Sequence, residues 1–71
     1  MTRATFIDQI VKTYAQKWNC SPYRTALIKA RDRVQCVAGY RRGGEHHHAA
    51  EYLTQAGEFR RYAAAEKGKP S

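Results

Sequence analysis

Residues 22–44, PYRTALIKARDRVQCVAGYRRGG, decide the fold because they read as one long helix with a defined start and a defined stop. Ser21 is a good N-cap, and Pro22 suits the first helical position, where its missing N–H is not needed. Gly43 and Gly44 predict the stop, since glycine accepts the left-handed conformation that ends many helices. We therefore expect a helix from Pro22 to about Tyr40 or Arg42. Its apolar residues recur at steps of four and three, as in helices packed nearly side by side: Tyr23, Leu27, Ala30, Val34 and Val37.

Two further helices are predicted, one on each side of this stretch. The first runs from about Ala4 to Trp18, with Thr2 or Thr5 as its N-cap. It has one wide apolar face, made of Phe6, Ile7, Ile10, Val11, Tyr14, Ala15 and Trp18. The last runs over about 45–66, and its apolar seam again steps by three and four: Ala49, Tyr52, Ala56, Phe59 and Ala63, with Leu53 alongside. No stretch alternates with period two for long enough to predict a strand.

These patterns predict an all-α fold of three helices, over about 4–18, 22–42 and 45–66. Residues 1–66 form one domain, followed by a flexible basic tail over 67–71. The last two helices are each about 30 Å long and are expected to form a long antiparallel hairpin. Their seams hold few large apolar residues, which is thin for a core that stands alone. We therefore predict a homodimer paired across a two-fold axis; the alternative is a monomer whose first helix caps the hairpin.

Composition narrows the class of protein. The 71 residues include 13 Lys and Arg against 6 Asp and Glu, a net charge of +7, and the isoelectric point is about 9.9. No apolar run approaches the roughly 18 to 20 residues of a membrane span, and the first residues do not form a signal peptide. Cys20 and Cys36 are too few for a disulfide framework and are expected to be reduced thiols. We expect a small cytoplasmic binding protein.

Basic residues are densest in the helix over 22–42. At about 100° per residue, Arg24, Arg31 and Arg42 fall on one line, and Lys29, Arg33 and Tyr40 fall on the other flank of the apolar seam. Guanidinium groups neutralise phosphates and release counterions, so two such basic ridges favour nucleic acid as a partner. Tyrosine beside arginine is also common at interaction hot spots. The candidate binding residues are Arg24, Lys29, Arg31, Arg33, Tyr40, Arg41, Arg42, Arg60, Arg61 and Tyr62.

No arrangement of residues predicts catalysis, a cofactor or a metal site. His46, His47 and His48 are consecutive, so on a helix their rings point in three directions, whereas metal ligands on a helix come three or four residues apart. No spacing brings either cysteine to a histidine and a carboxylate. A separate hypothesis is that protonation of the histidines in mild acid strengthens anion binding while weakening the helix start that they occupy.

The function expected is that of a small non-enzymatic regulator. No motif identifies a family, although in size and composition the chain is similar to small regulators and inhibitors of phages and other mobile elements. The leading hypothesis is a dimeric helical regulator that binds nucleic acid through the basic faces of the helix over 22–42. A helix-turn-helix version would present Tyr23, Arg24, Thr25 and Lys29 to a groove, but its turn lacks the usual glycine. The alternative is an inhibitor or adaptor that docks on an acidic host protein and blocks its function.

Overall fold

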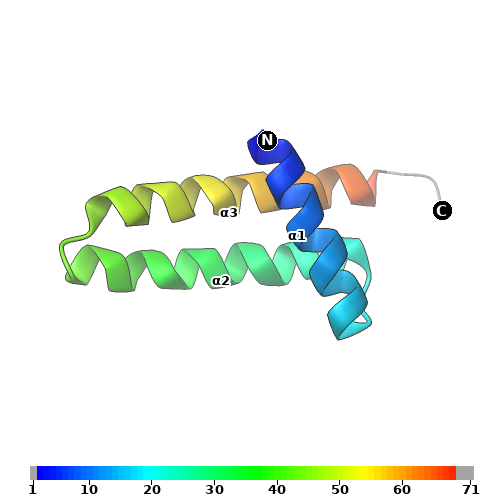
Figure 1. Cartoon of the computed structure of the whole chain (residues 1–71), viewed down its shortest axis with the longest axis horizontal. Helices are drawn as coiled ribbons and strands as arrows, with labels where there is room; N and C mark the ends of the chain where they lie inside the picture. The colour runs from blue at the N-terminus through cyan, green and yellow to red at the C-terminus, as the bar shows by residue number, and fades with distance from the viewer. Residues whose placement is uncertain (1, 69–71) are drawn as a thin grey trace.

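The computed structural model describes residues 2–68, which form three helices and no strand: α1 (Arg3–Trp18), α2 (Pro22–Arg42) and α3 (His46–Lys67). The helices α2 and α3 lie side by side and run in opposite directions (Figure 1). The shorter α1 crosses both of them near the end where α2 begins and α3 stops (Figure 1). The prediction of an all-α fold with three helices is confirmed.

Local signals set the helix ends. The Thr2 hydroxyl accepts a hydrogen bond from the backbone N–H of Thr5 at 3.2 Å, and the Ser21 hydroxyl caps Arg24 N–H at the same distance. Both N-caps are therefore side-chain oxygens that satisfy donors in the first turn. Asn19, just past α1, adopts φ 53°, and Gly44, between α2 and α3, adopts φ 78°.

The bounds differ slightly from the sequence-based ones. Helix α1 begins at Arg3 rather than Ala4, and α3 runs from His46 to Lys67 rather than from 45 to 66. Lys67, which was expected to open the tail, belongs to the last turn of α3, and the rest of the predicted tail after Gly68 lies outside the described residues.

The core lies where the three helices meet. Helix α1 contributes Ile7 and Val11, and α3 contributes Phe59, whose side chain is fully buried. Against them pack three small residues: Ala26 and Ala30 of α2 and Ala63 of α3. Alanines let the two long helices approach closely, and the Phe59 ring fills the space beneath α1.

The predicted inward face of α2 is partly wrong. Leu27 and Val34 were placed on the seam, yet they are 42% and 36% exposed, and Leu53 of α3 is 47% exposed. Ala30 and Val37, which were also placed on the seam, are buried as predicted, and Ala26, which was not placed there, is buried beside them. The helix is rotated about its axis because close packing against α3 favours its small side chains over its large ones. Trp18, expected on the core face of α1, is 39% exposed.

Within the described range, no helix combines the length and the apolar character needed to cross a bilayer. This agrees with the absence of an apolar run in the sequence.

Candidate binding surface

The structure separates the basic residues of α2 into two groups. Arg24, Arg31, Arg41 and Arg42 are exposed and form no ion pair with any residue of the range 2–68. Lys29 and Arg33, which were predicted to form the second basic ridge, are instead held against neighbouring helices. The first group is available to a partner, and the second holds the fold together.

Arg33 lies between α2 and α3. Its guanidinium Nε donates to the side-chain oxygen of Gln55 at 2.9 Å, and its guanidinium carbon lies 4.9 Å from the centre of the Tyr52 ring. The side chain is only 18% exposed, with Asp32 as its nearest carboxylate at 3.8 Å. A planar cation stacked on an aromatic ring and bonded to an amide is a packing element.

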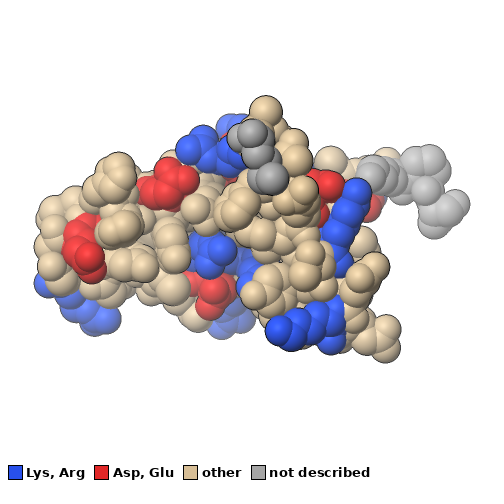
Figure 2. Space-filling model, in the orientation of Figure 1, with Lys and Arg blue, Asp and Glu red and all other residues tan. Residues whose placement is uncertain are grey.

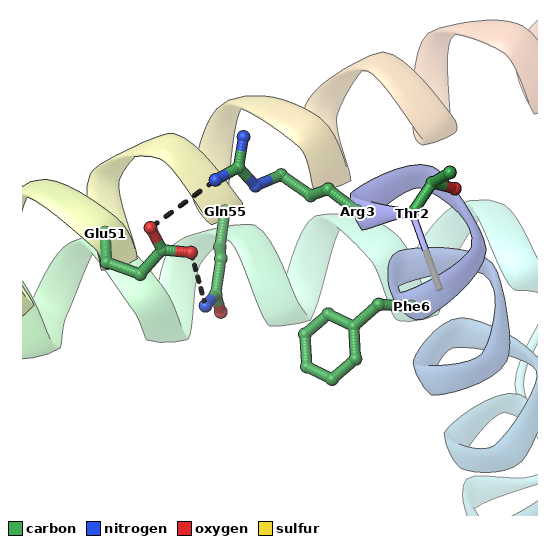
Figure 3. A pocket seen from close by; sticks show the side chains of 5 residues that line it. All are labelled: Thr2, Arg3, Phe6, Glu51 and Gln55. Atoms are coloured by element: carbon green, nitrogen blue, oxygen red, sulfur yellow. Dashed lines mark hydrogen bonds and ion pairs between the residues drawn. The ribbon is translucent and has the colours of Figure 1, made fainter.

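Gln55 extends this contact to α1. Its amide nitrogen donates to Glu51 at 3.4 Å, and Glu51 in turn accepts from the guanidinium of Arg3 at 3.5 Å. Figure 3 shows Glu51 between its two partners at the edge of a shallow pocket that Thr2 and Phe6 also line. Because the polar groups of the pocket bind one another, it is a junction between helices that presents no free catalytic group.

Lys29 joins α2 to α1 in a different way. Its ammonium nitrogen lies 3.5 Å from the centre of the Tyr14 ring and 5.1 Å from that of Trp18. Cation–π contacts of this kind stabilise packed helices by about 0.5–1 kcal/mol or more. Because Lys29 lies against these two rings of α1, its side chain is half-buried.

The two tyrosine clusters are also engaged within the fold. The Tyr40 ring meets Tyr52 edge-on at 5.1 Å and lies 5.3 Å from the His48 ring; a hydrogen bond with Tyr52 raises the pKa of Tyr40. Burial, together with the carboxylates of Glu66 and Asp8, raises the pKa of Tyr62 to about 12. Both rings therefore have partners within the fold, and both remain partly exposed.

The arginines beside Tyr62 differ from each other. Arg61 pairs with Glu58 at 3.3 Å, on the same helix, whereas Arg60 is exposed and has no ion-pair partner among residues 2–68. The predicted cluster of Arg60, Arg61 and Tyr62 is thus divided, and only Arg60 joins the exposed, unpaired group.

The helix-turn-helix interpretation does not fit the position of α2. Thr25 is fully buried, and its hydroxyl donates to the backbone oxygen of Ser21 at 2.9 Å. Tyr23 packs against the core and Lys29 lies under α1. Of the four residues expected to face a groove, only Arg24 is exposed.

Three of the exposed large apolar side chains point away from α1: Leu27 and Val34 of α2 and Leu53 of α3. Ile28 of α2, which is 42% exposed, lies about 100° from both Leu27 and Lys29 and is not part of this group. Two residues turn a helix by about 200°. Leu27 comes two residues before Lys29, which contacts α1, and Leu53 comes two residues after Glu51, which binds Arg3 of α1. Val34 is seven residues on from Leu27 and so lies on nearly the same line.

Arginines surround these apolar residues. Arg24 and Arg31 come three residues before and four after Leu27, Arg41 comes seven after Val34, and Arg60 comes seven after Leu53. Each spacing returns a side chain to the same side of its helix. We call this surface the back face; it comprises Arg24, Leu27, Arg31, Val34, Arg41, Leu53 and Arg60.

The acidic side chains discussed next lie outside the back face. Asp8 is on α1, while Glu51 and Glu58 are seven residues apart on the side of α3 that meets α1. Asp32 is about 60° from Lys29 around α2, again toward α1. Figure 2, which views the α1 side, shows both signs of charge there. The back face, in contrast, contains four arginines and no acidic residue.

No metal-ligand cluster is found among the described residues. No group of three His, Cys, Asp or Glu side chains in residues 2–68 could hold an ion. The three histidines are exposed at the start of α3, and Cys20 and Cys36 are free thiols. Sequence patterns identified the arginines of the back face, whereas its leucines were assigned to the core.

No protein-family model, characterised protein or solved structure matches this chain.

Proposed function

We propose that the chain is a non-enzymatic regulator that binds nucleic acid through the exposed arginines of α2. The observation that carries the proposal is that Arg24, Arg31, Arg41 and Arg42 have no ion pair within residues 2–68. An arginine without an internal partner is free to neutralise a phosphate and release its counterion. Arg60 on α3 extends the same basic surface.

The spacing suits contacts to a phosphate backbone. At 1.5 Å per residue, Arg24 and Arg31 are about 10 Å apart along α2, and Arg42 is about 16 Å further on. Because Lys29, Arg33 and both tyrosines are engaged in the fold, we propose contacts to phosphates without reading of base edges. Binding should therefore depend little on sequence.

The test is a fluorescence-anisotropy titration of labelled duplex and single-stranded oligonucleotides at several salt concentrations. Each phosphate neutralised contributes about 0.9 to the slope of log K against log salt for a duplex. The double variant R24A/R31A should lower this slope by about 2 and weaken every sequence alike. No binding at about 0.15 M salt would reject the proposal.

A matched control is the double variant K12A/K17A, which removes two exposed charges from α1. It has the same net charge as R24A/R31A but leaves the back face intact. The salt slope of this control should stay close to that of the wild type. If both variants weaken binding equally, only the bulk charge of +7 matters, and the proposed site is wrong.

The homodimer stays part of the proposal. Among residues 2–68, the core contains six buried alanines and only four larger buried apolar residues, Ile7, Val11, Val37 and Phe59, so burial by a second copy would add stability. The α1 side suits self-pairing because it presents both signs of charge together with Phe6, which is 40% exposed. Light scattering distinguishes one chain of 8.1 kDa from two.

An inhibitor or adaptor that binds a protein is the second candidate. The exposed Leu27, Val34 and Leu53 favour it, because a phosphate backbone offers no apolar surface to cover them. A cytoplasmic location, in which Cys20 and Cys36 would be reduced thiols, is part of the proposal and fits either function.

A further inference from the structure

We infer that the back face binds an acidic amphipathic helix of a partner protein. The inference goes beyond nucleic-acid binding, and either activity can exist without the other. It rests on the combination, on one face, of exposed apolar side chains and arginines that have no partner within residues 2–68.

The apolar part of the face matches one side of a helix. Leu27 and Val34 are two turns apart on α2, about 10 Å along its axis, and Leu53 lies on the adjoining α3. The three side chains are 42%, 36% and 47% exposed. An amphipathic helix offers apolar side chains at steps of three, four and seven residues, so it can cover this surface along its length.

The positive charges of the back face require a partner that carries negative charge. Arg24 and Arg31 flank Leu27, Arg41 follows Val34, and Arg60 follows Leu53. The face has no carboxylate of its own, so glutamates or aspartates beside the apolar stripe of a partner helix would meet only cations. Such complementarity steers association and excludes partners of the wrong sign.

Other occupants fit less well. A second copy of this chain would bring four more arginines onto the face and no carboxylate, so like charges would oppose self-pairing there. A nucleic acid would pair with the arginines but leave the leucines and Val34 exposed. An acidic amphipathic helix would cover the apolar side chains of the face and also pair with its arginines.

The probe is a labelled synthetic 18-residue peptide with leucines at helical spacing and glutamates on both flanks of the leucine stripe. Its control is a scrambled peptide of the same composition, which keeps the charge but has no apolar stripe. We expect the patterned peptide to bind the full chain at least about tenfold more tightly than the scrambled one, as for contacts at an interaction hot spot.

Variants of the protein separate the contribution of the leucines to binding from that of the arginines. L27S/L53S should weaken binding of the patterned peptide about tenfold or more and leave binding of a duplex oligonucleotide unchanged. R24A/R31A should weaken binding of both ligands. T13S, at an exposed position of α1 and therefore outside the back face, is the control for substitution, and circular dichroism checks that every variant remains helical.

Several outcomes would overturn the inference. Equal binding of the two peptides would show attraction by charge alone. Unchanged peptide binding in L27S/L53S would remove the leucines from the interface. Conversion of a dimer to a monomer by L27S/L53S, seen by light scattering, would assign the face to a second copy. Duplex binding without peptide binding would leave nucleic acid as the ligand, whereas peptide binding without duplex binding would overturn the proposed function and keep the inference.

Discussion

A single residue, Arg33, illustrates how a charged side chain can belong to the interior. Sequence patterns place it on a basic ridge because its angle around α2 matches that of Lys29 and Tyr40. In the structure its guanidinium group instead lies over the Tyr52 ring and donates a hydrogen bond of 2.9 Å to Gln55. No sequence pattern shows this, since it depends on two side chains that lie about twenty positions further along the chain.

We expect R33A to lower the free energy of unfolding by about 2 kcal/mol, because it breaks a half-buried hydrogen bond and leaves Gln55 without that partner. R33K should recover little of the loss, since an ammonium group cannot reproduce the planar stacked contact. Urea unfolding followed by circular dichroism measures both variants. R31A, at an exposed position two residues earlier, should change stability by less than about 0.5 kcal/mol; a similar loss in R31A and R33A would contradict the assignment.

The helices themselves were largely predictable, while their rotation was not. Ser21 with Pro22, and Gly43 with Gly44, set the ends of α2 through local backbone chemistry, which a sequence shows directly. The predicted seam of α2 combined Leu27 and Val34 with Ala30 and Val37, whereas the interior takes only Ala30 and Val37, together with Ala26. Hydrophobicity favours burial of Leu27 and Val34, but close packing against the alanines of α3 turns the small side chains inward. That rotation is what exposes the leucines of the back face.

Two glycines of this part of the chain should respond to the same substitution in opposite ways. Gly44 has φ 78°, which a side chain disfavours, so G44A should lower the free energy of unfolding by about 1 kcal/mol. Gly39 lies inside α2, and a Cβ there would meet no atom within 4 Å. G39A should therefore raise the free energy of unfolding by about 0.5–1 kcal/mol. Thermal unfolding of the two variants beside the wild type provides the measurement. Destabilisation by G39A would mean that the helix is interrupted near that position.

At the scale of the whole molecule, charge is divided between two sides. Among residues 2–68, Arg3 pairs with Glu51 between α1 and α3 at 3.5 Å, and shorter-range pairs at 3.0–3.8 Å lie within single helices. The acids on the α1 side thus offset cations there. The excess positive charge is left on α2 and on the back face. Folding gathers these arginines, so the folded state carries a repulsion that the extended chain largely avoids.

This division predicts that salt stabilises the protein. Two charges about 10 Å apart, such as Arg24 and Arg31, repel by about 0.4 kcal/mol in water, and several such pairs add up. Exposed ion pairs lose only a few tenths of a kcal/mol each when screened, so repulsion dominates at a net charge of +7. Raising sodium chloride from about 10 mM to 0.3 M shortens the screening length from about 30 Å to less than 10 Å and should raise the midpoint of thermal unfolding by several degrees. R24A/R31A should be more stable than the wild type at low salt and respond less to added salt. A midpoint that falls with salt would show that attractive pairs, rather than the unpaired arginines, set the electrostatic balance of the fold.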